Sequence, residues 1–143
     1  MQKHIRSAVF GVALAAIAVI IVVVTWAPGS ARAQQQPQGV ERKILRRQDL
    51  PMPGWEAVMI QTTVQPGGTE GWHTHPGTLL EYVIQGPWTM ERRGKSTATY
   101  QTGETFSIVQ GEVHQAINPG KTAVRGLAIL IVDKSKPMTT QVQ

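Results

Sequence analysis

Turn-forming residues interrupt this chain at short intervals from Val40 onward, and they leave no stretch with helical periodicity. The segments between the turns are rich in β-branched and aromatic residues, which favours strands. We expect nine strands, at residues 41–45, 56–64, 71–75, 79–85, 88–92, 97–101, 105–108, 114–118 and 124–132. Many short strands at this spacing predict an all-β sandwich or barrel. The last strand is almost entirely apolar, so we expect it to be buried on both faces.

Residues 1–33 are typical of a targeting segment. Two basic residues precede a nearly unbroken apolar run at 8–27, and the small-x-small pattern of a cleavage site ends at Ala33. The run approaches the length of a membrane-spanning helix, so two interpretations stay open. Cleavage after Ala33 gives a secreted or periplasmic protein, which we favour because Pro28-Gly29 breaks the helix just before that site. An uncleaved segment anchors the same domain to the membrane, again outside the cytoplasm.

The rest of the chain has room for a single domain. Residues 34–39 are polar and contain a proline, which predicts a linker. We assign residues 40–133 to the β-barrel and residues 134–143 to a polar tail, which we expect to be frayed.

The charge of the chain does not indicate a nucleic-acid partner. Removal of the leader takes away three of the fourteen basic residues and none of the nine acids, so the formal charge falls from +5 to +2. The remaining basic clusters are expected to be solvated strand ends and a turn. We therefore expect a small-molecule ligand, no nucleic acid, and membrane contact only through an uncleaved leader.

Histidines are the strongest candidates for chemistry. The chain has no cysteine, so any metal must be held by imidazole and oxygen ligands. His73 and His75 are one residue apart in an expected strand, which points both side chains to the same face. A third, His114, begins another expected strand, and the only other histidine, His4, lies in the leader. The three domain histidines are best explained by a shared site.

The residues around these histidines resemble the two motifs of the cupin family. Residues 67–86 contain a Gly, five residues, His-x-His, a following acid and a closing Gly. Residues 103–118 are similar to the second motif, with two residues between Gly111 and His114 and three residues between His114 and Asn118. The exception in the second motif is Val109, where the family usually has Pro.

The cupin resemblance implies a single-domain jelly-roll β-barrel and usually a homodimer. In the family, three histidines and one Glu bind a divalent metal, commonly iron, manganese, nickel or zinc. His73, His75 and His114 match the three histidines. Three neutral imidazoles suit iron, copper, nickel or zinc better than magnesium or calcium.

The carboxylate is displaced from the family pattern. The usual Glu position is Leu79 here, and Glu81 lies two residues further, on the same face of the strand. Three roles for Glu81 stay open: a fourth metal ligand, a substrate-facing and catalytic acid beside a three-His site, or a partner of a nearby base. A site that has lost its metal also stays open.

Several other side chains have two readings each. Glu70 and Glu112 lie near the motif histidines and either orient an imidazole or sit in loops at the rim. Asn118 is expected to be a structural turn residue. The aromatic residues either line a ligand cavity or belong to the core: Trp72, Tyr82, Trp88, Tyr100 and Phe106.

The sequence predicts an exported small cupin that binds a divalent metal, with a dioxygenase-like reaction on a small organic substrate as the first hypothesis. Leu79 in place of the usual Glu favours a non-catalytic metal or small-ligand binding module as the alternative. A third, weaker hypothesis is an interaction protein with vestigial histidines. The fold accommodates all three.

Overall fold

The computed structural model describes residues 37–143. The leader and most of the linker lie outside the described residues, so cleavage after Ala33 stays a prediction. Within residues 37–143, no helix is long and apolar enough to cross a membrane.

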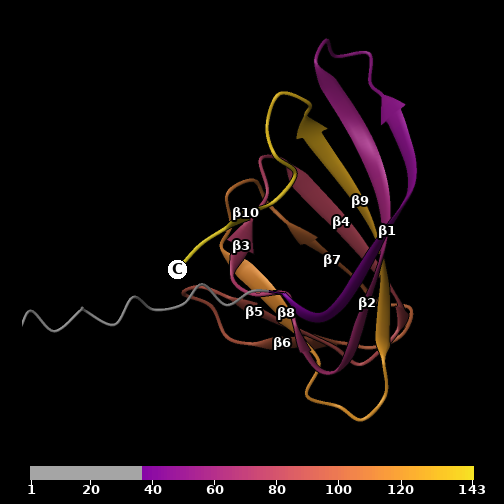
Figure 1. Ribbon diagram of the computed structural model, residues 1–143, viewed down its shortest axis with the longest axis vertical. Coiled ribbons are helices and arrows are strands. Elements are labelled where there is room, and N and C mark those ends of the chain that lie inside the picture. The colour runs from indigo at the N-terminus through magenta and orange to yellow at the C-terminus, as the bar shows by residue number, and fades with distance from the viewer. Residues whose placement is uncertain (1–36) are drawn as a thin grey trace, which may run out of the picture. The chain divides into compact units, whose positions relative to one another are not determined.

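The described residues form an all-β fold, as predicted, and all nine expected strands are present (Figure 1). A tenth strand follows them in the tail. The strands are β1 (Gln38–Asp49), β2 (Trp55–Thr69), β3 (His73–Thr74), β4 (Thr78–Gln85), β5 (Trp88–Arg92), β6 (Ala98–Tyr100), β7 (Thr105–Ile108), β8 (His114–Ile117), β9 (Val124–Asp133) and β10 (Thr140–Gln141).

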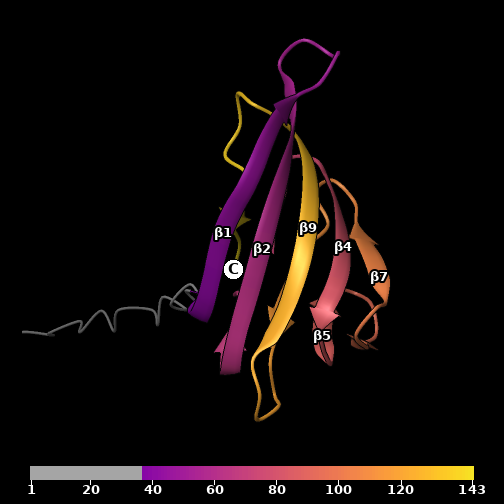
Figure 2. The same ribbon diagram turned by 90° about the vertical axis from the view of Figure 1, so that its right-hand side faces the viewer.

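The strands make a nearly closed antiparallel barrel. The hydrogen-bonded order is β10-β3-β8-β2-β9-β4-β7, with β1 paired to β2, and β5 paired to β8 and β6. Figure 2 shows β1, β2, β9, β4 and β7 side by side as one layer. The shorter strands β3, β8, β5 and β6 form the facing layer (Figure 1), and this layer carries the histidines.

Alternation along β4 and β9 separates the inside of the barrel from the outside. In β4, Leu79, Glu81 and Val83 are buried, while Leu80 and Tyr82 point outward and are exposed. In β9 the inward residues are buried, whereas the outward ones are half-buried or, at Arg125, exposed. The expectation that β9 is buried on both faces is therefore wrong. Within the described residues no further layer covers its outer face. The prediction was wrong because it inferred burial on both faces from the apolar sequence of the strand alone.

The C-terminal tail is ordered against the barrel, and the expectation that it frays is wrong. Strand β10 pairs with β3 antiparallel, with Gln141 opposite His73. The Val142 amide donates to the Trp72 carbonyl at 2.9 Å, and Arg93 donates to the Gln143 carbonyl at 2.6 Å. Hydrogen bonds to its backbone hold this segment in place. Such bonds do not depend on the type of side chain, so the polar sequence of the tail gave no strand pattern.

Candidate metal centre

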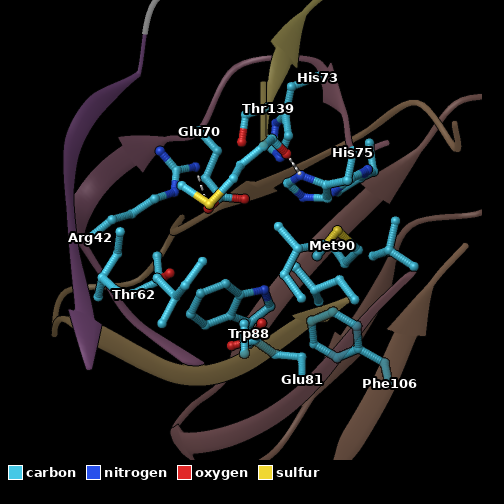
Figure 3. Close-up of a pocket in the computed structure, with 18 residues that line it drawn as sticks. Arg42, Thr62, Glu70, His73, His75, Glu81, Trp88, Met90, Phe106 and Thr139 are labelled. Carbon is cyan, nitrogen blue, oxygen red and sulfur yellow. Dashed lines mark hydrogen bonds and ion pairs between the residues drawn. The ribbon is translucent and has the colours of Figure 1, made fainter. Parts of the chain in front are cut away.

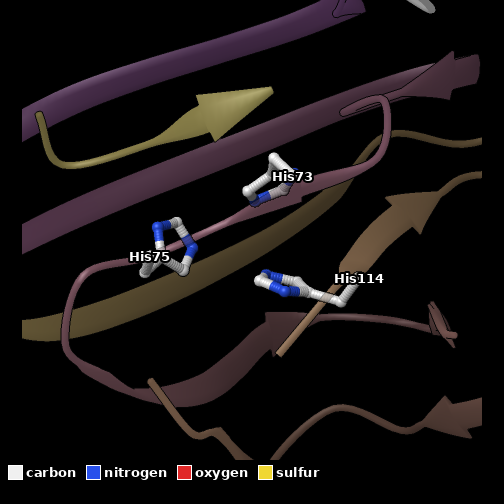
Figure 4. Close-up of side chains that lie close together, drawn as sticks. All are labelled: His73, His75 and His114. Carbon is white, nitrogen blue, oxygen red and sulfur yellow. The ribbon is translucent and has the colours of Figure 1, made fainter. Parts of the chain in front are cut away.

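Two short neighbouring strands bring the three predicted histidines together (Figure 4). His73 in β3 is the register partner of His114 in β8, so these two side chains lie across one strand pair. His75 follows β3 on the same face as His73. One ring nitrogen from each histidine lies within 4.8 Å of the other two. The histidines predicted from sequence to share a site do so.

A backbone carbonyl fixes the orientation of each imidazole. The Nδ1–H groups of His73, His75 and His114 donate to the carbonyls of Gly71, Met138 and Glu112, each at 2.8 Å. A ring that donates from Nδ1 carries its free lone pair on Nε2. Three imidazoles therefore present Nε2 lone pairs toward one centre, which is the arrangement that a metal ion requires.

Burial keeps the three rings neutral. It lowers the pKa of His75 and His114 to about 4 and also lowers the pKa of His73, while hydrogen bonds to backbone carbonyls act in the opposite direction. Metal binding needs the unprotonated ring. At neutral pH the site is thus a set of ready nitrogen donors rather than a cluster of cations.

The donor set fits a divalent transition metal. Imidazole nitrogens suit zinc, copper, iron and nickel, whereas magnesium and calcium prefer oxygen. Three protein ligands also leave coordination positions open, as in catalytic rather than structural metal sites. The centre can hold a metal ion and still accept a further molecule on it.

Glu81 lies inside the barrel but is not a member of the compact cluster. Its side chain is buried, and Oε1 has no hydrogen-bond partner. Burial, reinforced by Glu70, raises the pKa of Glu81 to about 8. Within residues 37–143 it makes no ion pair, so its interpretation as the partner of a base does not hold. The roles of fourth ligand and substrate-facing acid stay predictions.

Glu70 is a buried acid behind the histidines rather than a residue at the rim. Its Oε1 accepts from Arg42 at 2.8 Å, and its Oε2 accepts from the Ala116 amide at 3.2 Å. Burial acts to raise the pKa of Glu70, but Arg42, His73, His114 and that amide outweigh it and lower the pKa. Glu70 is therefore an anion held next to the site by its ion pair. Sequence spacing gave no signal for Arg42, which is 28 residues away.

Glu112 orients an imidazole, but through its backbone. Its carbonyl receives the Nδ1–H of His114, while its carboxylate lies 2.7 Å from Lys95 and 3.5 Å from Arg92. Asn118 has the structural role expected of it, since its amide donates to the Val64 and Thr122 carbonyls at 2.8 Å.

A cavity of about 160 Å³ connects the histidines with the barrel interior (Figure 3). Trp88 and Phe106 line it, as one reading of the aromatic residues proposed. Tyr82 instead points outward and Tyr100 packs on Phe106. The tail residues Met138 and Thr139 also line the cavity, and nothing in the sequence pointed to them.

Residues 60–130 match a known family, Cupin_2, described as a cupin domain. No curated protein matches the chain. Many solved structures do, and three are representative of the fold.

A cupin-like protein from Thermotoga maritima is 20% identical, with a TM-score of 0.63, and the match covers 82% of this chain and 87% of that one. The polyketide cyclase RemF from Streptomyces resistomycificus is also 20% identical, with a TM-score of 0.62 and coverage of 78% and 76%. An oxalate oxidase in complex with the substrate analogue glycolate is 24% identical, with a TM-score of 0.59. The match covers 76% of this chain and 58% of that one. At these identities the likeness concerns the fold alone.

Proposed function

We propose that the chain, whose residues 60–130 match the cupin domain family, binds one divalent transition metal through the Nε2 atoms of His73, His75 and His114. The observation that carries the proposal is the set of three Nδ1–H bonds to backbone carbonyls. These bonds fix all three tautomers with their lone pairs directed to one place. Iron, manganese, nickel, zinc and copper are the candidate ions.

We further propose that the site performs a dioxygenase-like reaction, in which both atoms of dioxygen enter a small organic substrate. A bound metal would supply open coordination positions for substrate and dioxygen. The chain's own residues hold the ion, keep its ligands neutral and enclose the substrate in a mainly apolar cavity. The fold also occurs in an oxalate oxidase and a polyketide cyclase, which supports an enzyme only by analogy.

A non-catalytic metal or small-ligand binding module is the second candidate. Leu79 occupies the position where the family usually has a metal-binding Glu, and the compact cluster contains no carboxylate. Oxygen-electrode measurements on the iron-loaded chain with small hydroxylated aromatic compounds separate the two candidates. Substrate-dependent oxygen uptake that His114→Ala abolishes supports the enzyme, whereas stoichiometric metal without oxygen uptake supports the binding module.

The experiment on metal binding itself uses the purified full chain. Metal content after incubation with iron, manganese, nickel, zinc or copper and removal of free metal should approach one ion per chain. His73→Ala and His114→Ala should each lose it. A wild-type chain that stays free of all five metals contradicts the proposal.

Location and assembly are proposals of the same kind. The apolar run and the Ala33 site support export, which N-terminal sequencing of the mature protein would test. The exposed outer residues of β4, Leu80, Tyr82 and Ile84, support a homodimer because an apolar sheet face is suited to self-association. Sedimentation of the wild type and of Tyr82→Glu tests it: a wild-type monomer contradicts the homodimer.

A further inference from the structure

Two polar atoms in the wall of the cavity lack hydrogen-bond partners. They are Oε1 of Glu81 and Nε1 of Trp88, and both side chains are at least nine-tenths buried. Buried polar groups are normally paired, so each unpaired one calls for an explanation. One other buried side-chain atom of the described residues has no hydrogen-bond partner. It is Nε of Arg92, whose guanidinium group donates through its other nitrogens to Tyr100 and to the Ser107 carbonyl. Only the first two line the cavity.

Glu81 and Trp88 lie at the end of the cavity that is remote from the metal ligands. In Figure 3 both are on the side away from His73 and His75. The cavity thus has a nitrogen-rich end, where a metal would bind, and an inner end with two unpaired polar groups between apolar walls. A molecule that spans the cavity meets both.

The sequence of β9 leaves space for the Glu81 carboxyl group. A Cβ atom at Gly126 would overlap Oε1 of Glu81 and would lie 3.1 Å from Cζ3 of Trp88. The next inward residue, Ala128, is also small and is the register partner of Glu81. The carboxyl group therefore occupies a recess that any larger residue at Gly126 would fill.

The chemistry of the two groups defines what they can bind. The indole N–H can only donate a hydrogen bond. Burial raises the pKa of Glu81, so at neutral pH its carboxyl group is a neutral donor and acceptor. A ligand hydroxyl group, which both accepts and donates, can pair with either of these groups, whereas a bare hydrocarbon leaves both unpaired.

The cavity also limits the size of the ligand. Its volume is about 160 Å³, and an apolar cavity of about 150 Å³ in another protein holds benzene. Phe106, Ile108 and Leu130 contribute apolar walls. One six-membered ring with one or two small substituents fits.

We infer that Glu81 and Trp88 form a recognition site for a neutral, ring-sized organic ligand whose hydroxyl group binds at the inner end of the cavity. The inference rests on the proposed function in that the other end of the ligand would face the metal. It assigns Glu81 to the recognition of the organic molecule and not to the coordination of the metal. It also gives the substrate class as small hydroxylated cyclic compounds.

The test compares phenol with benzene by isothermal titration calorimetry on the full chain, both as purified and after metal removal with EDTA. We expect the wild type to bind phenol about tenfold or more tightly than benzene, because a site built for a hydroxyl group rejects the analogue that lacks it. Glu81→Leu and Trp88→Phe should remove this preference, since an apolar site disfavours the hydroxyl group. Glu81→Gln, which still donates, should retain most of it.

Ile108→Val is the matched control, since it alters an apolar wall and should change both affinities in parallel. Melting temperatures show which variants are folded. The inference is overturned if the wild type binds phenol and benzene equally or binds neither. It is also overturned if the preference survives in both Glu81→Leu and Trp88→Phe. An internal water would then be the partner of these groups. Phenol binding is measured on the EDTA-treated chain, and metal content is measured in a separate experiment. The proposal of the recognition site and the proposal of the metal site can therefore be refuted independently.

Discussion

Deletion of the last seven residues, 137–143, is expected to weaken metal binding although none of them is a metal ligand. The deletion removes the Met138 carbonyl, which receives the Nδ1–H of His75 at 2.8 Å, and it removes the pairing of β10 with β3. Loss of the group that orients a metal-binding histidine typically costs about 10- to 100-fold in affinity. That range corresponds to about 1.4–2.7 kcal/mol of binding free energy.

Competition with a chromophoric zinc chelator measures the effect, and two controls define its origin. Met138→Leu changes the side chain but keeps the carbonyl, so it should bind zinc like the wild type. Deletion of Val142 and Gln143 alone leaves both β10 and Met138 in place and should have little effect. If the seven-residue deletion melts normally and binds zinc as tightly as the full chain, the Met138 carbonyl does not position His75.

Two further predictions concern Glu81 and its recess. The pKa of Glu81 is near 4.5 in the unfolded chain but about 8 in the fold. Between these pH values the carboxyl group is ionised only in the unfolded chain, so its contribution lowers the free energy of unfolding as the pH rises from 4.5 to 8. Glu81→Gln should therefore raise the free energy of unfolding at pH 8 relative to pH 4.5, on the order of a few kcal/mol, as urea denaturation at the two pH values would show; equal effects at both contradict the burial argument. Gly126→Ala should destabilise the fold by about 1–3 kcal/mol through overlap with Glu81, and Glu81→Ala should relieve most of that cost in the double variant; additive effects in urea denaturation would place the strain elsewhere.

Local sequence patterns predicted the parts of this protein that depend on local geometry. Turn residues located all nine expected strands, and the two-residue strand period placed His73 and His75 on one face. His114 joined them because the family resemblance paired its motif with theirs, and the register of β3 with β8 confirms that they share a site.

Most of the features that were missed depend on backbone conformation or on contacts between distant segments. The three carbonyls that fix the imidazoles have no sequence signature: those of Gly71 and Glu112 are two residues from His73 and His114, and that of Met138 is 63 residues away from His75. The ion pair of Glu70 with Arg42 likewise requires β1 to lie over the site. The outer face of β9 was misjudged because an apolar strand gives the same pattern whether or not a further layer covers it.

X-ray absorption spectroscopy of the zinc-loaded chain tests the central claim most directly, because it counts the imidazole ligands on the metal. The structure predicts three imidazole nitrogens at about 2.0–2.1 Å from zinc, with one fewer in His75→Ala. Two imidazoles or fewer in the wild type, or a spectrum unchanged by His75→Ala, would contradict a metal centre built from His73, His75 and His114.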